Sequence, residues 1–173
     1  QQTGALLVVN HQRRFSPAYR RLAAHVSAGA LGKLTSSYVQ WGKGRLGNVG
    51  THTIDALRMV PGQEVEAVSG VLDLSGRQDC RGAEFQDPGG WGRLRMSAGT
   101  IALLDAPDYG ETPIQFLFNG TEAQAKIGPE MGTVDYKDGR TESWPTSDGD
   151  LSSMDHAVNE IVSWLDGNGV NTA

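Results

Sequence analysis

The chain has 173 residues, enough for one domain with a hydrophobic core, and a formal net charge of −5. The acidic balance argues against nucleic acid as a partner, because phosphate binding needs a basic face, and no apolar run approaches the ~20 residues of a membrane span. Its one cysteine excludes an internal disulfide and fits a reducing, cytoplasmic location.

The first part of the chain predicts a strand and then a helix. Residues 5–10 contain an apolar run of strand length. Ser16 followed by Pro17 is typical of a helix start, with serine as the cap and proline in the first turn. Gly29 should end this helix, because glycine adopts the left-handed conformation at little cost.

A strand, a glycine-rich loop and a short helix are expected next. Residues 34–41 alternate between polar and apolar side chains, as a half-buried strand does. Four glycines within residues 42–50 indicate a loop. Apolar residues at helical spacing then predict a helix over 51–60, which Pro61 ends.

The remaining sequence is mostly strand. Residues 64–74 predict a strand and 75–92 a long polar loop. Three turn signals predict hairpins, at Ala98-Gly99, Asn119-Gly120 and Asp138-Gly139. A last helix should start near Ser152 or Ser153 and bury Val158, Ile161, Val162 and Leu165. The whole predicts an α+β fold, an open and largely antiparallel sheet with helices on one face.

The run Gly42-Lys43-Gly44-Arg45-Leu46-Gly47 matches the dinucleotide-binding pattern G-x-G-x-x-G. Three expectations for that site fail. The preceding strand is half polar, the helix is predicted to open only after residues 48–50, and hairpins follow instead of a second crossover helix. We therefore interpret the run as a loop whose backbone can approach a ligand closely.

His52 and Asp55 are the strongest candidates for chemistry. Residues three apart share a helix face, so an imidazole and a carboxylate should project together from the first turn. Asn48, four residues before His52, adds an amide that can donate and accept hydrogen bonds. Thr51 before a helical pattern is equally typical of an ordinary N-cap.

Three segments resemble the glucose–fructose oxidoreductase / inositol dehydrogenase / MocA (Gfo/Idh/MocA) family. Residues 8–19, Val-Val-Asn-His-Gln-Arg-Arg-Phe-Ser-Pro-Ala-Tyr, resemble the entry to its second domain. Residues 29–32 resemble its Gly-x-x-Gly connection into a long strand, and residues 50–55 resemble its Gly-x-His-x-x-Asp signature. The segments occur in the family's order and spacing, over nearly the whole chain.

The resemblance implies a two-domain enzyme of which this chain matches only the second domain. The first domain of the family is a Rossmann domain that binds NAD or NADP, and no counterpart of it or of its Lys-Pro dipeptide is visible here. The second domain resembles that of dihydrodipicolinate reductase. We therefore expect residues 1–173 to be a single substrate-binding and dimerisation domain, truncated at both ends and binding no cofactor alone.

The resemblance also assigns roles to residues. It implies His52 as the proton-transfer residue, Asn48 as its orienter at a position where the family commonly has Asp, and Asp55 as a ligand for a substrate hydroxyl. Arg14, Asn10 and Trp41 are expected near the substrate, with Arg14 equally suited to pairing with a carboxylate. The implied partners are a sugar, cyclitol or related polyol and a second copy bound through the sheet face.

Two other functions remain open. The missing cofactor domain and the Asn48 departure also fit a non-catalytic ligand-binding or assembly module. A metal-dependent lyase or hydrolase using His52 and Asp55 is a third hypothesis, although no metal ligands are predicted beyond these two.

Overall fold

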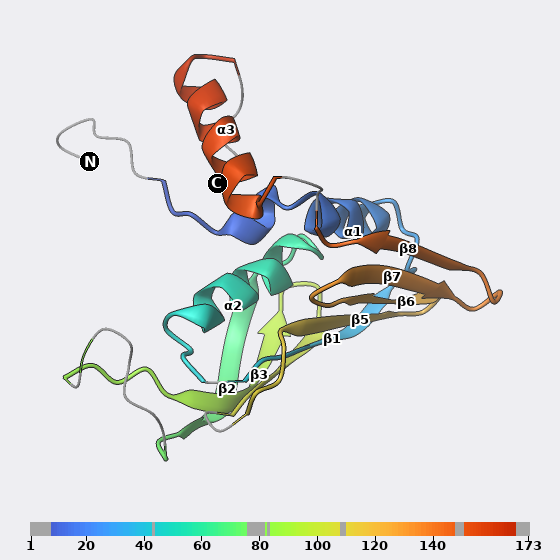
Figure 1. Cartoon of the computed structure of the whole chain (residues 1–173). Helices are drawn as coiled ribbons and strands as arrows, with labels where there is room; N and C mark the ends of the chain where they lie inside the picture. The colour runs from blue at the N-terminus through green and yellow to red at the C-terminus, as the bar shows by residue number, and fades with distance from the viewer. Residues whose placement is uncertain are drawn as a thin grey trace.

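The computed structural model describes residues 8–42, 44–75, 82, 84–107, 110–147 and 151–168. Eight strands of this part form one sheet, shown in Figure 1. In their order across the sheet they are β2 (Val65–Asp73), β3 (Gly89–Met96), β4 (Ile101–Ala106), β1 (Leu34–Gln40), β5 (Gln115–Gly120), β6 (Ala123–Ile127), β7 (Met131–Tyr136) and β8 (Thr141–Pro145). Only β1 and β4 run parallel; the other neighbouring pairs are antiparallel.

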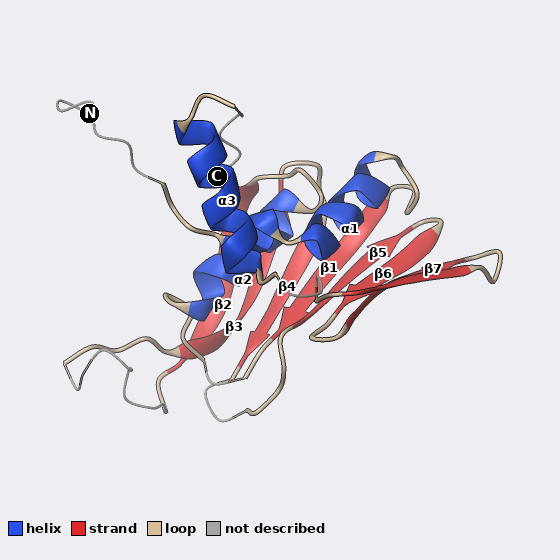
Figure 2. Cartoon of the chain, turned by 45° about the horizontal axis from the view of Figure 1, so that its top comes forward, coloured by secondary structure: helices blue, strands red, loops and turns tan. Residues whose placement is uncertain are grey.

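Helices α1 (Pro17–Ser27) and α2 (Val49–Met59) lie across one face of this sheet, whereas α3 (Ser153–Leu165) stands away from it (Figure 2). A short 3-10 turn, η1 (Gln12–Phe15), packs against all three helices. The α+β fold with an open, largely antiparallel sheet is confirmed. No helix in the described ranges is long and apolar enough to cross a membrane.

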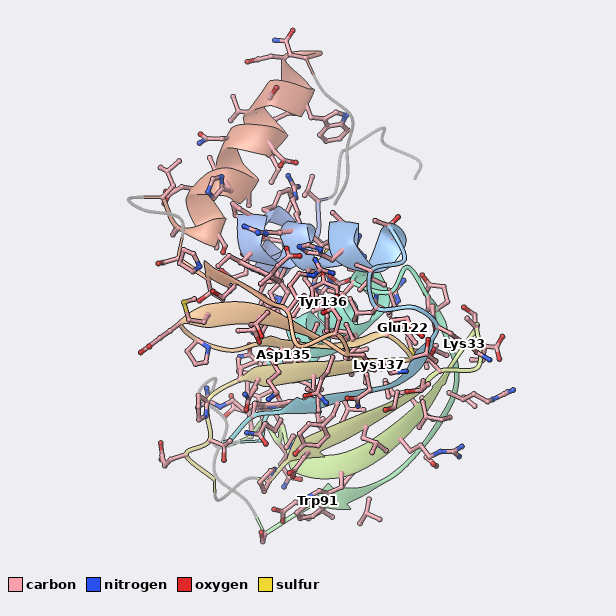
Figure 3. All side chains as sticks on the ribbon, turned by 90° about the vertical axis from the view of Figure 1, so that its right-hand side faces the viewer. Lys33, Trp91, Glu122, Asp135, Tyr136 and Lys137 are labelled. Atoms are coloured by element: carbon pink, nitrogen blue, oxygen red, sulfur yellow. The ribbon has the colours of Figure 1, made fainter. Side chains whose placement is uncertain are left out.

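The core fills the space between the helices and the sheet. Leu22 of α1 and Leu57 of α2 are fully buried against strand residues such as Val39, Phe116 and Phe118. Because strand side chains alternate between faces, the intervening residues project from the opposite face, which none of the described helices covers. We call this second face the open face. Trp91 of β3 and Asp135 of β7, both labelled in Figure 3, belong to it by register.

Several predicted elements are confirmed. Ser16 precedes α1 as its N-cap residue, and Gly29 follows the helix at φ +76°. The turns at Ala98-Gly99 and Asp138-Gly139 join antiparallel strands as predicted, with Gly99 and Gly139 at positive φ. These features are determined by a few consecutive residues, so they can be predicted from a short stretch of sequence.

Three boundaries were predicted wrongly. Helix α2 begins at Val49 instead of residue 51, and β3 already begins at Gly89, inside the expected polar loop. Residues 8–10 are not a strand; they lead into η1 through hydrogen bonds from the His11 N–H to Val9 O and from the Arg14 N–H to His11 O. The remainder of that predicted strand, residues 5–7, lies outside the described residues.

The hairpin at Asn119-Gly120 exists, but its turn lies two residues further on. Asn119 pairs with Gln124 and both Asn119 and Gly120 belong to β5, so Thr121 and Glu122 make the turn. A Cβ on Gly120 would lie 2.0 Å from the carbonyl oxygen of Leu31. Glycine is therefore needed here for a close approach between two chain segments, not for a turn.

Helix α3 does not bury the residues that its pattern predicted. Val158, Val162 and Leu165 are 51%, 50% and 58% exposed, and only Ala157 is fully buried. Its main packing is against η1, away from the sheet (Figure 2). The helical period identified an apolar face correctly, but no described element covers that face.

Candidate functional site

The predicted site residues gather where η1 meets the start of α2. His52 and Asp55 lie in the first turns of α2, and each contacts a residue at or beside η1. His52 meets His11, and Asp55 meets Arg14. We call these four residues the η1–α2 site. The two candidates thus share a helix face, as predicted, and each has its own partner from a distant segment.

Asp55 and Arg14 form a two-fold hydrogen-bonded ion pair. Nε and Nη2 of Arg14 donate to Oδ2 and Oδ1 of Asp55, each at 2.8 Å. Arg58 approaches the same carboxylate at 3.5 Å and also pairs with Glu64. Asp55 is only 3% exposed, so this pairing compensates its buried charge. The pair fastens η1 to α2, the alternative role considered for Arg14.

His52 is half-buried and lies against a second imidazole. The Nδ1 atoms of His11 and His52 are 3.4 Å apart, and the rings meet edge to face with centroids 5.3 Å apart. Burial lowers the pKa of His52 below its ordinary value; the positive charge of Arg13 and the neighbouring His11 lower it further, against a smaller opposite effect of Asp55. The geometry therefore favours a neutral imidazole, which can accept a proton.

The backbone at the start of α2 is held by Asp87, a residue that the sequence reasoning missed. Its carboxylate accepts hydrogen bonds from the N–H groups of Gly47 at 2.5 Å and Asn48 at 2.8 Å. Asn48 itself is exposed, one helical turn before His52, and its carbonyl accepts the Thr51 hydroxyl. Its role as the orienter of His52 stays a proposal, since the ring nitrogen contact given by the structure is with His11.

Two expected wall residues lie elsewhere. Trp41 is 1% exposed, donates from Nε1 to the carbonyl of Gly44 at 2.7 Å and packs below Gly50. It supports α2 from the core, and its place beside a substrate stays a prediction. Asn10 turns towards α3, where its amide contacts Sδ of Met154 at 3.1 Å. Its Oδ1 is buried without a hydrogen-bond partner among the described residues.

Sequence reasoning also missed His11 and Arg13. They lie in the segment 8–19 that carries the family resemblance, but nothing in their spacing indicates that they approach His52, 41 residues away from His11. The nearest signal was the density of histidine and arginine over residues 11–14.

The glycine-rich loop does not fit a dinucleotide. In such sites free backbone N–H groups bind the pyrophosphate, but here Asp87 accepts the N–H groups of Gly47 and Asn48. A Cβ on Gly42 would lie 2.3 Å from the Gly110 carbonyl, so that glycine serves chain packing. As predicted, the helix does not open at the third glycine, although α2 begins at Val49 and only Asn48 intervenes. The stronger reason to reject a dinucleotide site is the Asp87 carboxylate, which already accepts the N–H groups of Gly47 and Asn48.

Within the described ranges no group of three or more His, Cys, Asp or Glu side chains is arranged to hold a metal ion. His52 and Asp55 turn towards His11 and Arg14 respectively. The described residues therefore give the metal-dependent hypothesis no ligand set.

Comparison with solved structures identifies the class of fold. The eight-stranded sheet and its helices match the C-terminal domain of Gfo/Idh/MocA-type oxidoreductases, as the sequence resemblance predicted. No protein-family model and no curated protein matches the chain in sequence.

Three solved structures show how similar this fold is to known ones. Levoglucosan dehydrogenase in complex with NADH and levoglucosan superposes with a TM-score of 0.79 at 17% identity, over 99% of this chain and 60% of that one. An oxidoreductase from Sinorhizobium meliloti gives 0.77 at 16%, over 98% and 56%. A super-repressor mutant of Gal80p from Saccharomyces cerevisiae gives 0.79 at 12%, over 98% and 57%. The chain spans less than two thirds of each.

Proposed function

We propose that this chain is the substrate-binding and dimerisation domain of a cytoplasmic NAD(P)-dependent oxidoreductase acting on a sugar, cyclitol or related polyol. The observation that carries the proposal is the half-buried His52, whose pKa is lowered and whose Nδ1 lies 3.4 Å from that of His11. The relatives add support, because levoglucosan dehydrogenase was solved with NADH and a sugar derivative.

In this proposal neutral His52 takes the proton from a substrate hydroxyl. Contact between Nδ1 and His11 leaves Nε2 as the accepting atom, and a base that is neutral near pH 7 is suited to that transfer. His11 fixes the ring orientation and can share the proton. The nicotinamide cofactor, whose binding elements are not found in the described residues, would be held by another part of the protein.

Asp55 and Arg14 have a positioning role in this scheme. Their ion pair sets the distance between η1 and α2, and therefore the distance between His11 and His52. Oδ1 of Asp55 accepts hydrogen bonds from Arg14 and Arg58, whereas Oδ2 accepts one from Arg14 and has a further lone pair. We also propose that Asp55 binds a substrate hydroxyl directly. Asn48, the N-cap residue of α2, would lie beside the substrate.

The test uses an intact protein that contains both this chain and a nicotinamide-binding domain. His52→Ala should lower kcat for polyol oxidation by about 10²-fold or more, because general-base catalysis is lost. His25→Gln, which changes a histidine of α1 stacked on Trp144, is the control and should leave kcat within about twofold. An unchanged kcat in His52→Ala would exclude His52 as the base.

The second part of the proposal is dimerisation through the open face. Val71, Trp91 and Leu103 are exposed there on three adjacent strands, around a hollow of about 540 Å3 that Tyr38 and Asp105 also line. Large exposed apolar side chains on neighbouring strands are typical of an interaction surface.

A non-catalytic assembly module is the second candidate. It is favoured by the similarity in fold to Gal80p, which was solved as a super-repressor mutant, and by the ion pair that already joins Asp55 to Arg14. The two functions differ in one measurement. A module that dimerises but shows no NMR shift at His52 on titration with glucose or inositol would support assembly over catalysis.

A further inference from the structure

A second hollow lies beside η1, among the starts of α1 and α3 and the segment that follows β8. Its volume is about 430 Å3, within the range of ~300–1,000 Å3 for small-molecule sites. The polar side chains that line it are Gln12, Arg13, Ser16, Tyr19, Thr146, Ser147 and Ser153. No aspartate or glutamate belongs to its described lining, so the charge it presents is that of a cation.

Arg13 supplies that charge without a carboxylate partner among the described residues. Its Nε donates to the Tyr19 hydroxyl at 3.3 Å, and its guanidinium lies 5.9 Å from the ring centroids of Tyr19 and Phe116. Arg14, in contrast, already forms an ion pair with Asp55. A guanidinium held by neutral groups keeps donors in a fork that matches a carboxylate or phosphate.

Ser16 gives an independent indication of a ligand. It is 3% exposed and stands at the N-cap of α1, yet its side chain makes no capping hydrogen bond. No acidic residue occupies the first turn of this eleven-residue helix. The Ser16 hydroxyl, which lines the hollow, and the N–H groups of Ala18 and Tyr19 in the first turn therefore remain available to an anion. Helix α3 is different, because Ser152 and Asp155 already form its capping box.

We propose that this hollow, the η1 anion pocket, binds an oxyanion: a carboxylate or phosphate group held by Arg13, Ser16 and the start of α1. Arg13 follows His11 by two residues, and Nδ1 of His11 lies 3.4 Å from Nδ1 of His52, so the pocket and His52 are neighbours along η1. One ligand can therefore place its anion in the pocket and a hydroxyl at His52. The resulting substrate class, sugar acids or sugar phosphates, rests on the proposed function, whereas the anion pocket itself does not.

Calorimetry and NMR on the 173-residue chain test the pocket with three probes at constant ionic strength: inorganic phosphate, gluconate and neutral glucose. Phosphate and gluconate should shift the amides of Ser16, Ala18 and Tyr19, and glucose should not. Arg13→Met should weaken phosphate binding by about tenfold or more, since a charge-assisted interaction is lost. Stronger binding of gluconate than of phosphate would identify the carboxylate as the preferred source, and the reverse would identify phosphate.

Two further variants separate a specific loss of phosphate binding from a general effect of charge or of folding. Arg95→Met removes a charge from an exposed pair with Glu66 on the open face and should leave phosphate binding unchanged. Ser16→Ala should leave the melting temperature nearly unchanged, because the hydroxyl makes no capping bond, yet weaken phosphate binding several-fold. Absence of phosphate and gluconate binding, or an equal loss in Arg13→Met and Arg95→Met, would overturn the pocket.

The proposed function can fail separately. An intact protein that oxidises neutral polyols as efficiently as their acids or phosphates would contradict the anionic substrate class and leave His52 catalysis standing. Binding of phosphate at Arg13 in a protein with no oxidoreductase activity would retain the pocket and remove the proposed function.

Discussion

The imidazole of His52 has its protonation set by three neighbours from the segment before α1 and from its own helix. Burial, Arg13 and His11 all disfavour the imidazolium, and only Asp55 favours it. Asn48, four residues before His52, carries no negative charge that would oppose this shift. The neutral ring is therefore the resting form near pH 7.

An NMR titration of the chain should give His52 a pKa below the ordinary 6.5. Arg13→Met should raise it, because a nearby positive charge is removed. The lowered pKa also links to stability: the contribution is complete above 6.5 and is lost as the pH falls from there through the pKa of the folded state. Arg95→Met, on the other face, should leave the titration unchanged; a pKa at or above 6.5 in the unmodified chain would contradict the buried arrangement.

The Arg14–Asp55 pair should matter more to stability than any surface pair of the molecule. Arg14→Met leaves a carboxylate that is 3% exposed without its main partner, and we expect a loss of roughly 2–4 kcal/mol in the free energy of unfolding. The partial exposure of Arg14 limits the effect. Urea unfolding measures it.

The matched control is again Arg95→Met. It breaks an exposed pair with Glu66 and should cost less than about 1 kcal/mol. Equal losses in the two variants would mean that Asp55 finds compensation from Arg58 or from water, and that the pair does not hold η1 in place.

At the scale of elements, α2 depends on an anchor from a distant segment. Asp87 accepts the two backbone N–H groups that precede the helix, so it fixes where the helix begins and how His52 is presented. Asp87→Ala should speed hydrogen exchange of the Gly47 and Asn48 amides and cost about 1–3 kcal/mol. Asp135→Ala, which removes only an exposed bond to Thr141, should change neither quantity by a comparable amount.

Elements that depend on local chemistry could be predicted from the sequence, and those that depend on distant packing could not. The Asp138-Gly139 hairpin follows from the positive φ that the turn requires. Asn119-Gly120 has the same signal, but Gly120 serves a close approach to Leu31, 89 residues earlier. The period of α3 predicted an apolar face without revealing that nothing in the described chain covers it.

The residues of the η1–α2 site also divide into those that local sequence could predict and those that depend on distant contacts. The helical spacing of His52 and Asp55 was enough to put them on one face of α2. Their partners His11 and Arg14, and the anchor Asp87, come from segments about 40 residues away, and contacts of that range leave no periodic pattern in one sequence.

At the scale of the whole molecule, the sheet has one face under helices and one open face. Self-association through the open face should be measurable by analytical ultracentrifugation. Leu103→Arg puts a charge within the exposed apolar group and should raise the dissociation constant of the dimer by about 100-fold or more. Leu165→Arg, on the exposed side of α3, should leave it unchanged; the opposite result would move the contact to α3.

The strand order also makes the two borders of the sheet unequal. On one border, β8 ends in Pro145, which cannot donate to a further strand. On the other, β2 carries Val68, Val71 and Leu72, all more than half exposed, beside backbone groups that no described strand pairs. When the protein is concentrated or warmed, edge-to-edge aggregation should therefore begin at β2. A Val68→Lys substitution would be the simplest way to make the protein resist aggregation during storage.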